Sequence, residues 1–192
     1  MRMFRSVICV CVLAMTSLVS YASCPEDGEA EYLKLNEGFE NSGFLMNIDF
    51  YFERMDFLAN CGVYSAAKGL GVLYINRKFV PKDLDKAIDY FVLAYSLKKE
   101  DEQDFQLDFM YALQLKVKAK QSGFEDYSAQ SLELLEKLYL AGYSQDSDLF
   151  YATSLISMKV DPNKGIRILQ ELDSSGYPKA RKYLDHIKTK GL

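Results

Sequence analysis

The stretch from residue 66 to residue 94 constrains the fold of this chain more than any other part. It runs AAKGLGVLYINRKFVPKDLDKAIDYFVLA, with small and large residues at helical spacing in two blocks that a short polar link joins. Gly71, Ala87 and Ala94 would let two helices approach closely, and the large side chains would fill the space between neighbouring pairs. The pattern predicts one helix-turn-helix unit of a stacked helical repeat.

The rest of the chain shows almost no strand signal and predicts more helices. Gly123, Gly142 and Gly176 are expected to end helices with a positive φ. Each of the four prolines lies at an expected helix edge: Pro25, Pro81, Pro162 and Pro178. The nine expected helices cover about residues 27–37, 47–60, 63–76, 83–98, 103–121, 126–141, 146–158, 162–174 and 177–189.

Internal repetition indicates that these helices are paired. Segment 132–138, followed by Ala-Gly-Tyr, recurs 34 residues later as segment 166–172, followed by Ser-Gly-Tyr. A second block, Asp-Phe-Met-Tyr-Ala at 108–112, recurs 40 residues later as Asp-Leu-Phe-Tyr-Ala at 148–152. Two blocks with different periods favour a two-helix unit with loops of variable length.

The 66–94 stretch resembles the Sel-one-like repeat, a relative of the tetratricopeptide repeats. Its first helix matches the family start A-x-x-x-L-G-x-x-Y with Ala66, Leu70, Gly71 and Tyr74. The family's second helix runs D-x-x-K-A-x-x-W/Y-F-x-x-A. It is matched by Asp83, Lys86, Ala87, Tyr90, Phe91 and Ala94.

Beyond residue 94 the resemblance is weaker. The later units lack the L-G step, and they place Ser131 and Gly165 where the small residue of the second helix is expected. Residues 24–60 match no repeat. The resemblance implies an all-α fold: a short α-solenoid of about three helix pairs in residues 63–192, behind a divergent N-terminal helical region in residues 23–62.

The first 22 residues have the pattern of a cleaved secretory signal. Arg2 and Arg5 form a positive region, and the apolar stretch that follows, residues 6–19, has 14 residues, fewer than a membrane span needs. Ser20 and Ala22 are the small residues expected before the cut. We therefore expect a signal peptide at 1–22 and a periplasmic or secreted product.

Two cysteines, Cys24 and Cys61, remain after this cut. In an exported protein they are expected to form one disulfide, which closes a loop of ~37 residues and stabilises the fold by a few kcal/mol. Two unpaired thiols are one alternative. A lipid anchor on Cys24 is another, because the small residues before it match an acylation signal, although Tyr21 stands where a leucine is usual.

The charge balance argues against a nucleic-acid partner. The formal net charge is −4, and loss of Arg2 and Arg5 would make it −6. Phosphate contacts need clustered cations, which this chain lacks. Its densest basic run, residues 116–120, alternates lysine with apolar residues, and we expect it to be the solvated end of a helix.

Patterns for catalysis and metal binding are weak, and we expect no cofactor and no metal. The single histidine, His186, lies in an expected terminal helix and should face solvent. The acidic clusters at 26–31 and 100–104 lie beside helix starts, where the helix dipole favours them; a paired-carboxylate glycosidase is the functional alternative. Ser65 and Lys68 match the letters S-x-x-K, but no K-T-G or S-D-N motif accompanies them.

Aromatic residues are the remaining signal, with 14 tyrosines and 12 phenylalanines. Phe50, Tyr51 and Phe57 crowd one short expected helix together with Phe52. They cannot all face inward, so they are the candidate partner-binding aromatics.

The resemblance and the absence of a clear catalytic motif together favour a binding function. We expect a non-enzymatic, exported protein–protein interaction module, an adaptor or scaffold of the bacterial cell envelope, with a protein partner. An immunity protein that neutralises a secreted antibacterial toxin is one alternative. A cell-wall or β-lactam hydrolase, which the family resemblance brings into consideration, is the other.

Overall fold

The structure, a computed structural model, describes residues 23–42, 47–76, 81–99 and 102–190. Within these ranges the chain is all-α, and each of the nine expected helices is present. The helices are α1 (Gly28–Asn41), α2 (Ile48–Asn60), α3 (Tyr64–Ile75), α4 (Leu84–Leu97), α5 (Phe105–Ser122), α6 (Glu125–Leu140), α7 (Gln145–Ser157), α8 (Pro162–Ser174) and α9 (Pro178–Lys190). The largest difference from expectation is α1, which ends at Asn41 rather than near residue 37.

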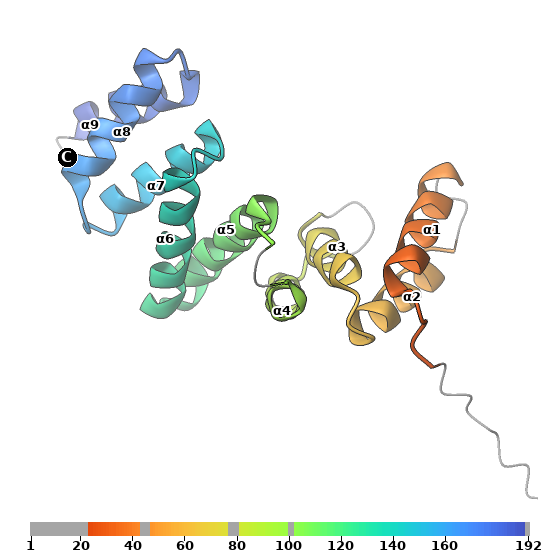
Figure 1. Cartoon of the computed structure of the whole chain (residues 1–192). Coiled ribbons are helices and arrows are strands. Elements are labelled where there is room, and N and C mark those ends of the chain that lie inside the picture. Colours follow the sequence, from red (N-terminus) through yellow and green to blue (C-terminus); the bar gives the residue numbers. More distant parts are fainter. Residues whose placement is uncertain (1–22, 43–46, 77–80, 100–101, 191–192) are drawn as a thin grey trace, which may run out of the picture.

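The helices stack in chain order into a short solenoid. In Figure 1 the colours run along the stack from α1 in orange to α9 in blue. The most extensive packing joins α3 to α4, α5 to α6 and α7 to α8, and these pairs are linked through α4–α5 and α6–α7. Each helix therefore packs mainly on its neighbours in the sequence, as expected for a solenoid.

Small residues allow close approach of the helices in two of these pairs. In the α5–α6 pair, Ser131 donates its hydroxyl to the carbonyl oxygen of Ala112 over 2.8 Å. In the α7–α8 pair, a Cβ added to Gly165 would lie 2.6 Å from the carbonyl oxygen of Ala152. The two alanines are 40 residues apart and their partners 34 apart, so the two sequence periods meet at one equivalent contact. Both periods therefore belong to the same two-helix unit.

The buried side chains form two clusters. The first runs from Phe39 to Leu107 and the second from Ala112 to Ala180, so packing changes from one cluster to the other within α5. The boundary expected after residue 62 lies inside the first cluster, which contains residues from both sides of it. Within this cluster, a Cβ added to Gly71 would lie 2.5 Å from Cε1 of Phe91, so the glycine lets α3 and α4 meet closely.

Acidic residues mark the helix starts. The side chains of Asp27, Asp83, Asp104 and Asp161 each accept a hydrogen bond from the backbone N–H three residues later. These bonds satisfy amides that have no partner inside the helix. The expectation that the acidic clusters serve helix starts is confirmed for Asp27 and Asp104.

Tyrosine hydroxyls connect helices through carboxylates. Five of them donate to carboxylates of other segments: Tyr64 to Asp104, Tyr90 to Asp56, Tyr95 to Asp108, Tyr151 to Glu136 and Tyr177 to Asp146. Asp108 is fully buried and also accepts from Lys137 over 2.7 Å. Its carboxylate therefore joins α4, α5 and α6 at the change from one buried cluster to the other.

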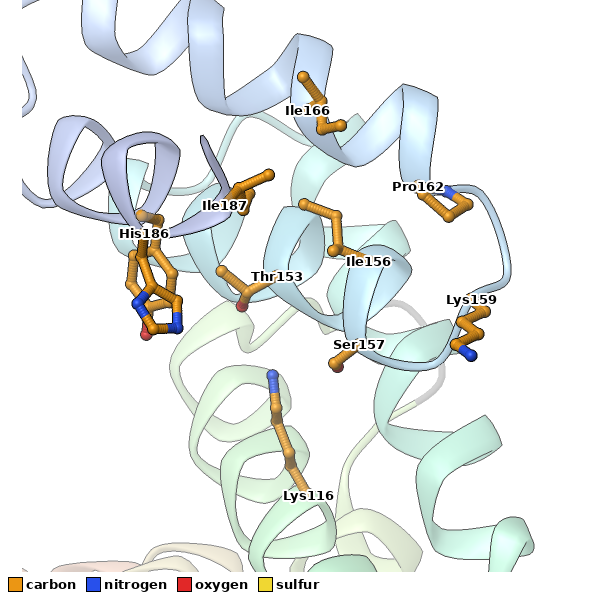
Figure 2. A pocket seen from close by; sticks show the side chains of 10 residues that line it. Lys116, Thr153, Ile156, Ser157, Lys159, Pro162, Ile166, His186 and Ile187 are labelled. Carbon is orange, nitrogen blue, oxygen red and sulfur yellow. The ribbon is translucent and has the colours of Figure 1, made fainter. Parts of the chain in front are cut away.

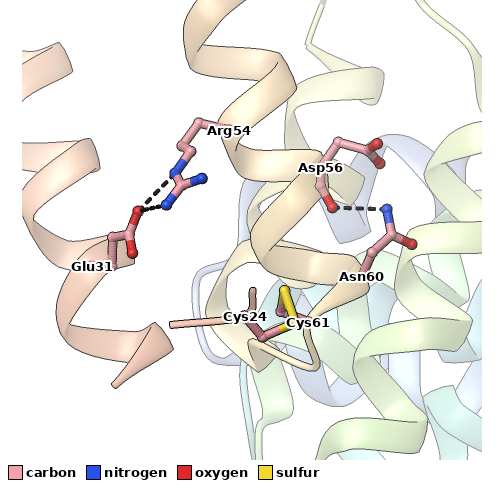
Figure 3. Close-up of a disulfide and its surroundings, with 6 residues drawn as sticks. All are labelled: Cys24, Glu31, Arg54, Asp56, Asn60 and Cys61. Atoms are coloured by element: carbon pink, nitrogen blue, oxygen red, sulfur yellow. Dashed lines mark hydrogen bonds and ion pairs between the residues drawn. A yellow bond between two sulfur atoms is a disulfide. The ribbon is translucent and has the colours of Figure 1, made fainter. Parts of the chain in front are cut away.

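A disulfide ties the segment before α1 to the end of α2. Cys24 and Cys61 are bonded, with their Cα atoms 5.4 Å apart, and an ion pair between Arg54 and Glu31 links the same two helices (Figure 3). The expected pairing is therefore present. Because the Cys24 sulfur is used in this bond, it is not free to form the thioether of a lipid anchor.

The expected signal peptide, residues 1–22, lies outside the described residues. Within the described part of the chain, none of the helices combines the length and the apolar character that crossing a bilayer requires.

Candidate functional site

Three pockets adjoin in the second half of the solenoid. A pocket of about 640 Å³ lies between α5, α7, α8 and α9, one of about 270 Å³ between α5, α6 and α7, and one of about 720 Å³ beside α5 and Phe150 of α7. Lys116 lines all three, so they form one continuous groove, the Lys116 groove. It is lined by Lys82, Leu113, Gln114, Lys116, Val117, Ala119, Lys120, Gln121, Ser128, Ser131, Phe150, Thr153, Ser154, Ile156, Ser157, Met158, Lys159, Pro162, Ile166, Tyr183, His186 and Ile187.

The pocket between α7, α8 and α9 is the apolar end of this groove. Ile156, Ile166 and Ile187 come from three different helices and face one space, as Figure 2 shows. Tyr183 is 44% exposed at its edge. A preformed, mostly aliphatic cavity of this size is typical of a ligand site.

Lys116 reaches across the groove from α5 to α7 (Figure 2). Its side chain is mostly buried. The ammonium donates to Oγ of Ser154 over 2.7 Å and lies 5.5 Å from the centroid of the Phe150 ring. Among the residues that the structure describes, no carboxylate lies within ion-pair distance of it. Burial without a counter-charge lowers the pKa of Lys116 to about 8.

Other partly buried lysines are treated differently by the fold. Lys68 is paired with Asp104, Lys118 with Asp85 and Lys164 with Glu136. A buried ammonium is costly without such a partner, and one that keeps its charge favours an anion. Lys116 is therefore the cation with the strongest reason to bind an anion from outside the chain.

The expectation that residues 116–120 form a solvated helix end is wrong for Lys116. Lys116 and Lys120 are four apart and share a face of α5, which the stack turns toward α7. Lys120 is exposed at the edge of the groove, and Lys118, on another face, pairs with Asp85. The sequence shows the lysines but not which face of α5 the next helix covers.

A second groove lysine, Lys159, occupies an unusual backbone position. Four helix ends share the same pair of backbone hydrogen bonds, in which the N–H groups of two successive residues turn back to the helix. The first of these residues has a positive φ in each case, and three of them are Gly62, Gly142 and Gly176. At the end of α7 the residue is Lys159, with φ of 58°. A side chain in this conformation costs roughly 1 kcal/mol relative to glycine.

The groove also contains an amide without a partner. Gln114 is only 7% exposed, and within the described residues its Oε1 accepts no hydrogen bond. It lines the largest of the three pockets. A buried polar atom left unpaired destabilises the free protein, and a bound donor would satisfy it.

Compared with protein family models, curated proteins and solved structures, the chain shows no match. The resemblance of residues 66–94 to the Sel-one-like repeat therefore stays a prediction. The groove itself must supply the argument for function.

The candidate aromatics on α2 lie far from this groove in the sequence, and their environments differ. Phe50 is 53% exposed. Phe57 is half-buried against the first cluster, with the Arg54 guanidinium 4.5 Å from its ring centroid. Tyr51 is 3% exposed: its ring stacks on Phe39, and its hydroxyl donates to Asn36 over 3.0 Å. As a partner-binding aromatic Tyr51 is a wrong prediction, because the helical period places it on the inner face of α2.

The S-x-x-K candidate is part of a structural network. The Lys68 ammonium is held by Asp104, which also accepts from Tyr64 over 2.6 Å. Burial opposes ionisation of Asp104, but the bonds from Lys68 and Tyr64 prevail and lower its pKa. Lys68 and Ser65 line a pocket of about 390 Å³ beside α1. An ammonium committed to this ion pair is not a free base for Ser65.

His186 is exposed on α9, as expected, and it lines the apolar pocket. The hydroxyls of Thr153 and Ser157 across the pocket donate to backbone carbonyls of α7. Ser154, which accepts from Lys116, is 2% exposed and donates to the carbonyl of Phe150. These three hydroxyls stabilise α7, and burial keeps the Ser154 hydroxyl from a substrate.

Metal chemistry finds no support in the described part of the chain. No group of three or more His, Cys, Asp or Glu side chains within it converges on a point where a metal ion would be held.

Proposed function

We propose that this chain is an exported protein-binding module that holds a segment of a partner protein in the Lys116 groove. The observation that carries this proposal is the groove itself, three adjoining pockets that join α5, α7 and α9 on a stacked helical scaffold. Helical solenoids present extended surfaces of this kind, and chain segments bind in grooves with apolar anchor sites.

The cellular setting is a second part of the proposal, an adaptor or scaffold in the bacterial cell envelope. It is supported by the signal-like pattern of residues 1–22 and by the Cys24–Cys61 disulfide, a bond typical of oxidising compartments. The resemblance of residues 66–94 to Sel-one-like repeats, which are binding scaffolds, supports the same role.

Binding is favoured over hydrolysis by the state of the groove hydroxyls. Thr153, Ser154 and Ser157 all donate to main-chain carbonyls of α7, and none of these bonds involves His186. A nucleophile would need its proton directed to a base. The arrangement suits recognition of a chain rather than its cleavage.

Site-specific photo-crosslinking in cells tests the proposal. A photoreactive amino acid replaces Tyr183 at the edge of the groove in one variant and Leu140, which is 77% exposed on α6, in a control. We expect a defined protein adduct from the Tyr183 position and none from Leu140. Adducts from Leu140 alone, or the same adducts from both positions, would contradict the groove. The adduct's identity separates an envelope adaptor from a toxin-neutralising protein.

A further inference from the structure

The groove places two lysines where each one weakens the folded chain. Lys116 is mostly buried with no carboxylate beside it, and Lys159 has a left-handed backbone where three equivalent helix ends have glycine. The two unfavourable features have unrelated causes, yet both lysines line the same apolar pocket. Strained or desolvated groups that gather at one site are a sign of function, because stability alone would not retain them.

The charge of the groove points in the same direction. Lys82 and Lys120 join the other two lysines along it. Among the described residues that line the groove there is no aspartate and no glutamate, although acidic residues outnumber basic ones in the chain by 27 to 23. A cationic groove on an acidic protein selects an anionic occupant and repels cationic ones.

The apolar walls define which anion fits. Ile156, Ile166 and Ile187 would contact the occupant beside the Lys116 ammonium, so its negative group must be next to a bulky apolar one. A nucleic acid would instead place a phosphate chain against these walls and bring many charges to a protein of net charge −4. A single fatty acid would fill one pocket and leave the other two empty.

The geometry points to an acidic peptide as the occupant of the Lys116 groove. An aspartate or glutamate carboxylate binds the Lys116 ammonium, a neighbouring aliphatic side chain fills the pocket between Ile156, Ile166 and Ile187, and Lys159 contacts a second carboxylate at the edge. Gln114 offers its unpaired amide oxygen to a backbone N–H of the same peptide. This inference rests on the proposed protein-binding function and specifies its ligand.

Fluorescence anisotropy of short labelled peptides tests the inference with the disulfide-bonded chain from residue 23 onward. One peptide alternates glutamate and leucine with serine spacers, and matched peptides carry glutamine or lysine in place of every glutamate. We expect the glutamate peptide to bind at least about tenfold more tightly than the glutamine peptide, and more weakly as salt is added. The lysine peptide should not bind.

Variants assign the effect to the groove. Lys116→Met and Lys159→Gly should each weaken binding of the glutamate peptide severalfold and leave the glutamine peptide unchanged. Lys116→Arg keeps the charge and should keep most of the affinity. Lys34→Met, which removes an exposed charge on α1, is the matched control and should change nothing. Thermal melts followed by circular dichroism confirm that each variant is folded.

Three results would overturn the inference. Equal affinity for the glutamate and glutamine peptides would show a groove that does not read charge, and the proposed protein-binding function would survive. Displacement of the glutamate peptide by decanoate at equal concentration, or by a dT oligonucleotide, would assign the groove to a lipid or a nucleic acid. Loss of affinity in Lys34→Met equal to that in Lys116→Met would place binding outside the groove.

Discussion

Lys159 at the end of α7 has the same left-handed backbone conformation that Gly176 has at the end of α8. The φ angles are 58° and 85°, and each residue donates its N–H to the carbonyl three residues back. Glycine has no Cβ and adopts this conformation without strain, whereas lysine does not. The two helix ends are therefore a matched pair in which only the side chain differs.

Replacing Lys159 with glycine should stabilise the protein. We expect Lys159→Gly to raise the free energy of unfolding by roughly 1 kcal/mol, because the left-handed conformation loses its strain. Urea denaturation with the disulfide intact measures the change. The reverse exchange, Gly176→Lys, should lower the free energy of unfolding by a similar amount; an unchanged midpoint in both variants would contradict the argument.

Removing the buried charge of Lys116 should also stabilise the free protein near neutral pH. The folded-state pKa of Lys116 is about 8, below the ordinary 10.5 of lysine. Below pH 8 the folded protein must carry this charge in the groove, which an unfolded chain exposes to water. Lys116→Met should therefore raise the free energy of unfolding by about 2 kcal/mol at pH 7.

The same lysine predicts how stability depends on pH. Between its folded pKa near 8 and its unfolded value of 10.5, the unfolded chain binds the proton and the folded chain does not, so the wild type gains stability as pH rises. The advantage of Lys116→Met should shrink by about 1 kcal/mol between pH 7 and pH 9.5. Above pH 10 buried tyrosines oppose the trend; burial raises the pKa of Tyr51 to about 12, so its contribution is lost as pH rises further. Parallel urea titrations at the two pH values measure the difference, and a constant gap would rule the explanation out.

Close helix packing at Gly165 predicts a strong effect of one methyl group. A Cβ there would lie 2.6 Å from the main-chain oxygen of Ala152, so α7 and α8 must separate. We expect Gly165→Ala to lower the free energy of unfolding by about 2 kcal/mol, despite the better helix propensity of alanine. Gly69→Ala is the control, because its Cβ would meet only the flexible end of Met55. It should be nearly neutral, and equal effects in thermal melts would refute the packing argument.

The buried carboxylate of Asp108 is expected to hold the two halves of the solenoid together. It accepts from Tyr95 of α4 and from Lys137 of α6. Asp108→Ala should lower the free energy of unfolding by about 3 kcal/mol, since it leaves both donors without their acceptor. The double variant with Lys137→Met should cost less than the sum of the two single changes. Additive effects would show that the two residues act independently.

The helix boundaries could be predicted because their signals are local. Asp161 and Pro162 start α8, Gly176 follows its end, and the helix matched expectation at both ends. The pairing of helices could also be predicted, since the two sequence periods follow the contacts of Ala112 and Ala152.

The groove could not be predicted from local signals, because it depends on which helix face the next helix covers. The lysines of residues 116–120 are equivalent in the sequence, and only the stack separates Lys116 from Lys118. The inner position of Tyr51 has the same cause. One usable signal was missed: Lys159 stands where the other two units have the Gly of their Gly-Tyr steps.

The wall that α9 contributes gives the groove a thermodynamic link to the end of the stack. α9 packs chiefly on α8, and it supplies Tyr183, His186 and Ile187 to the apolar pocket. Terminal elements of a solenoid detach more readily than inner ones because they have fewer neighbours. A molecule whose last helix has come away has no closed pocket, so docking of α9 and binding of an occupant are a coupled equilibrium. The affinity of the groove thus includes the free energy with which α9 is held, and an occupant that bridges α7 and α9 acts as the missing neighbour of the last helix.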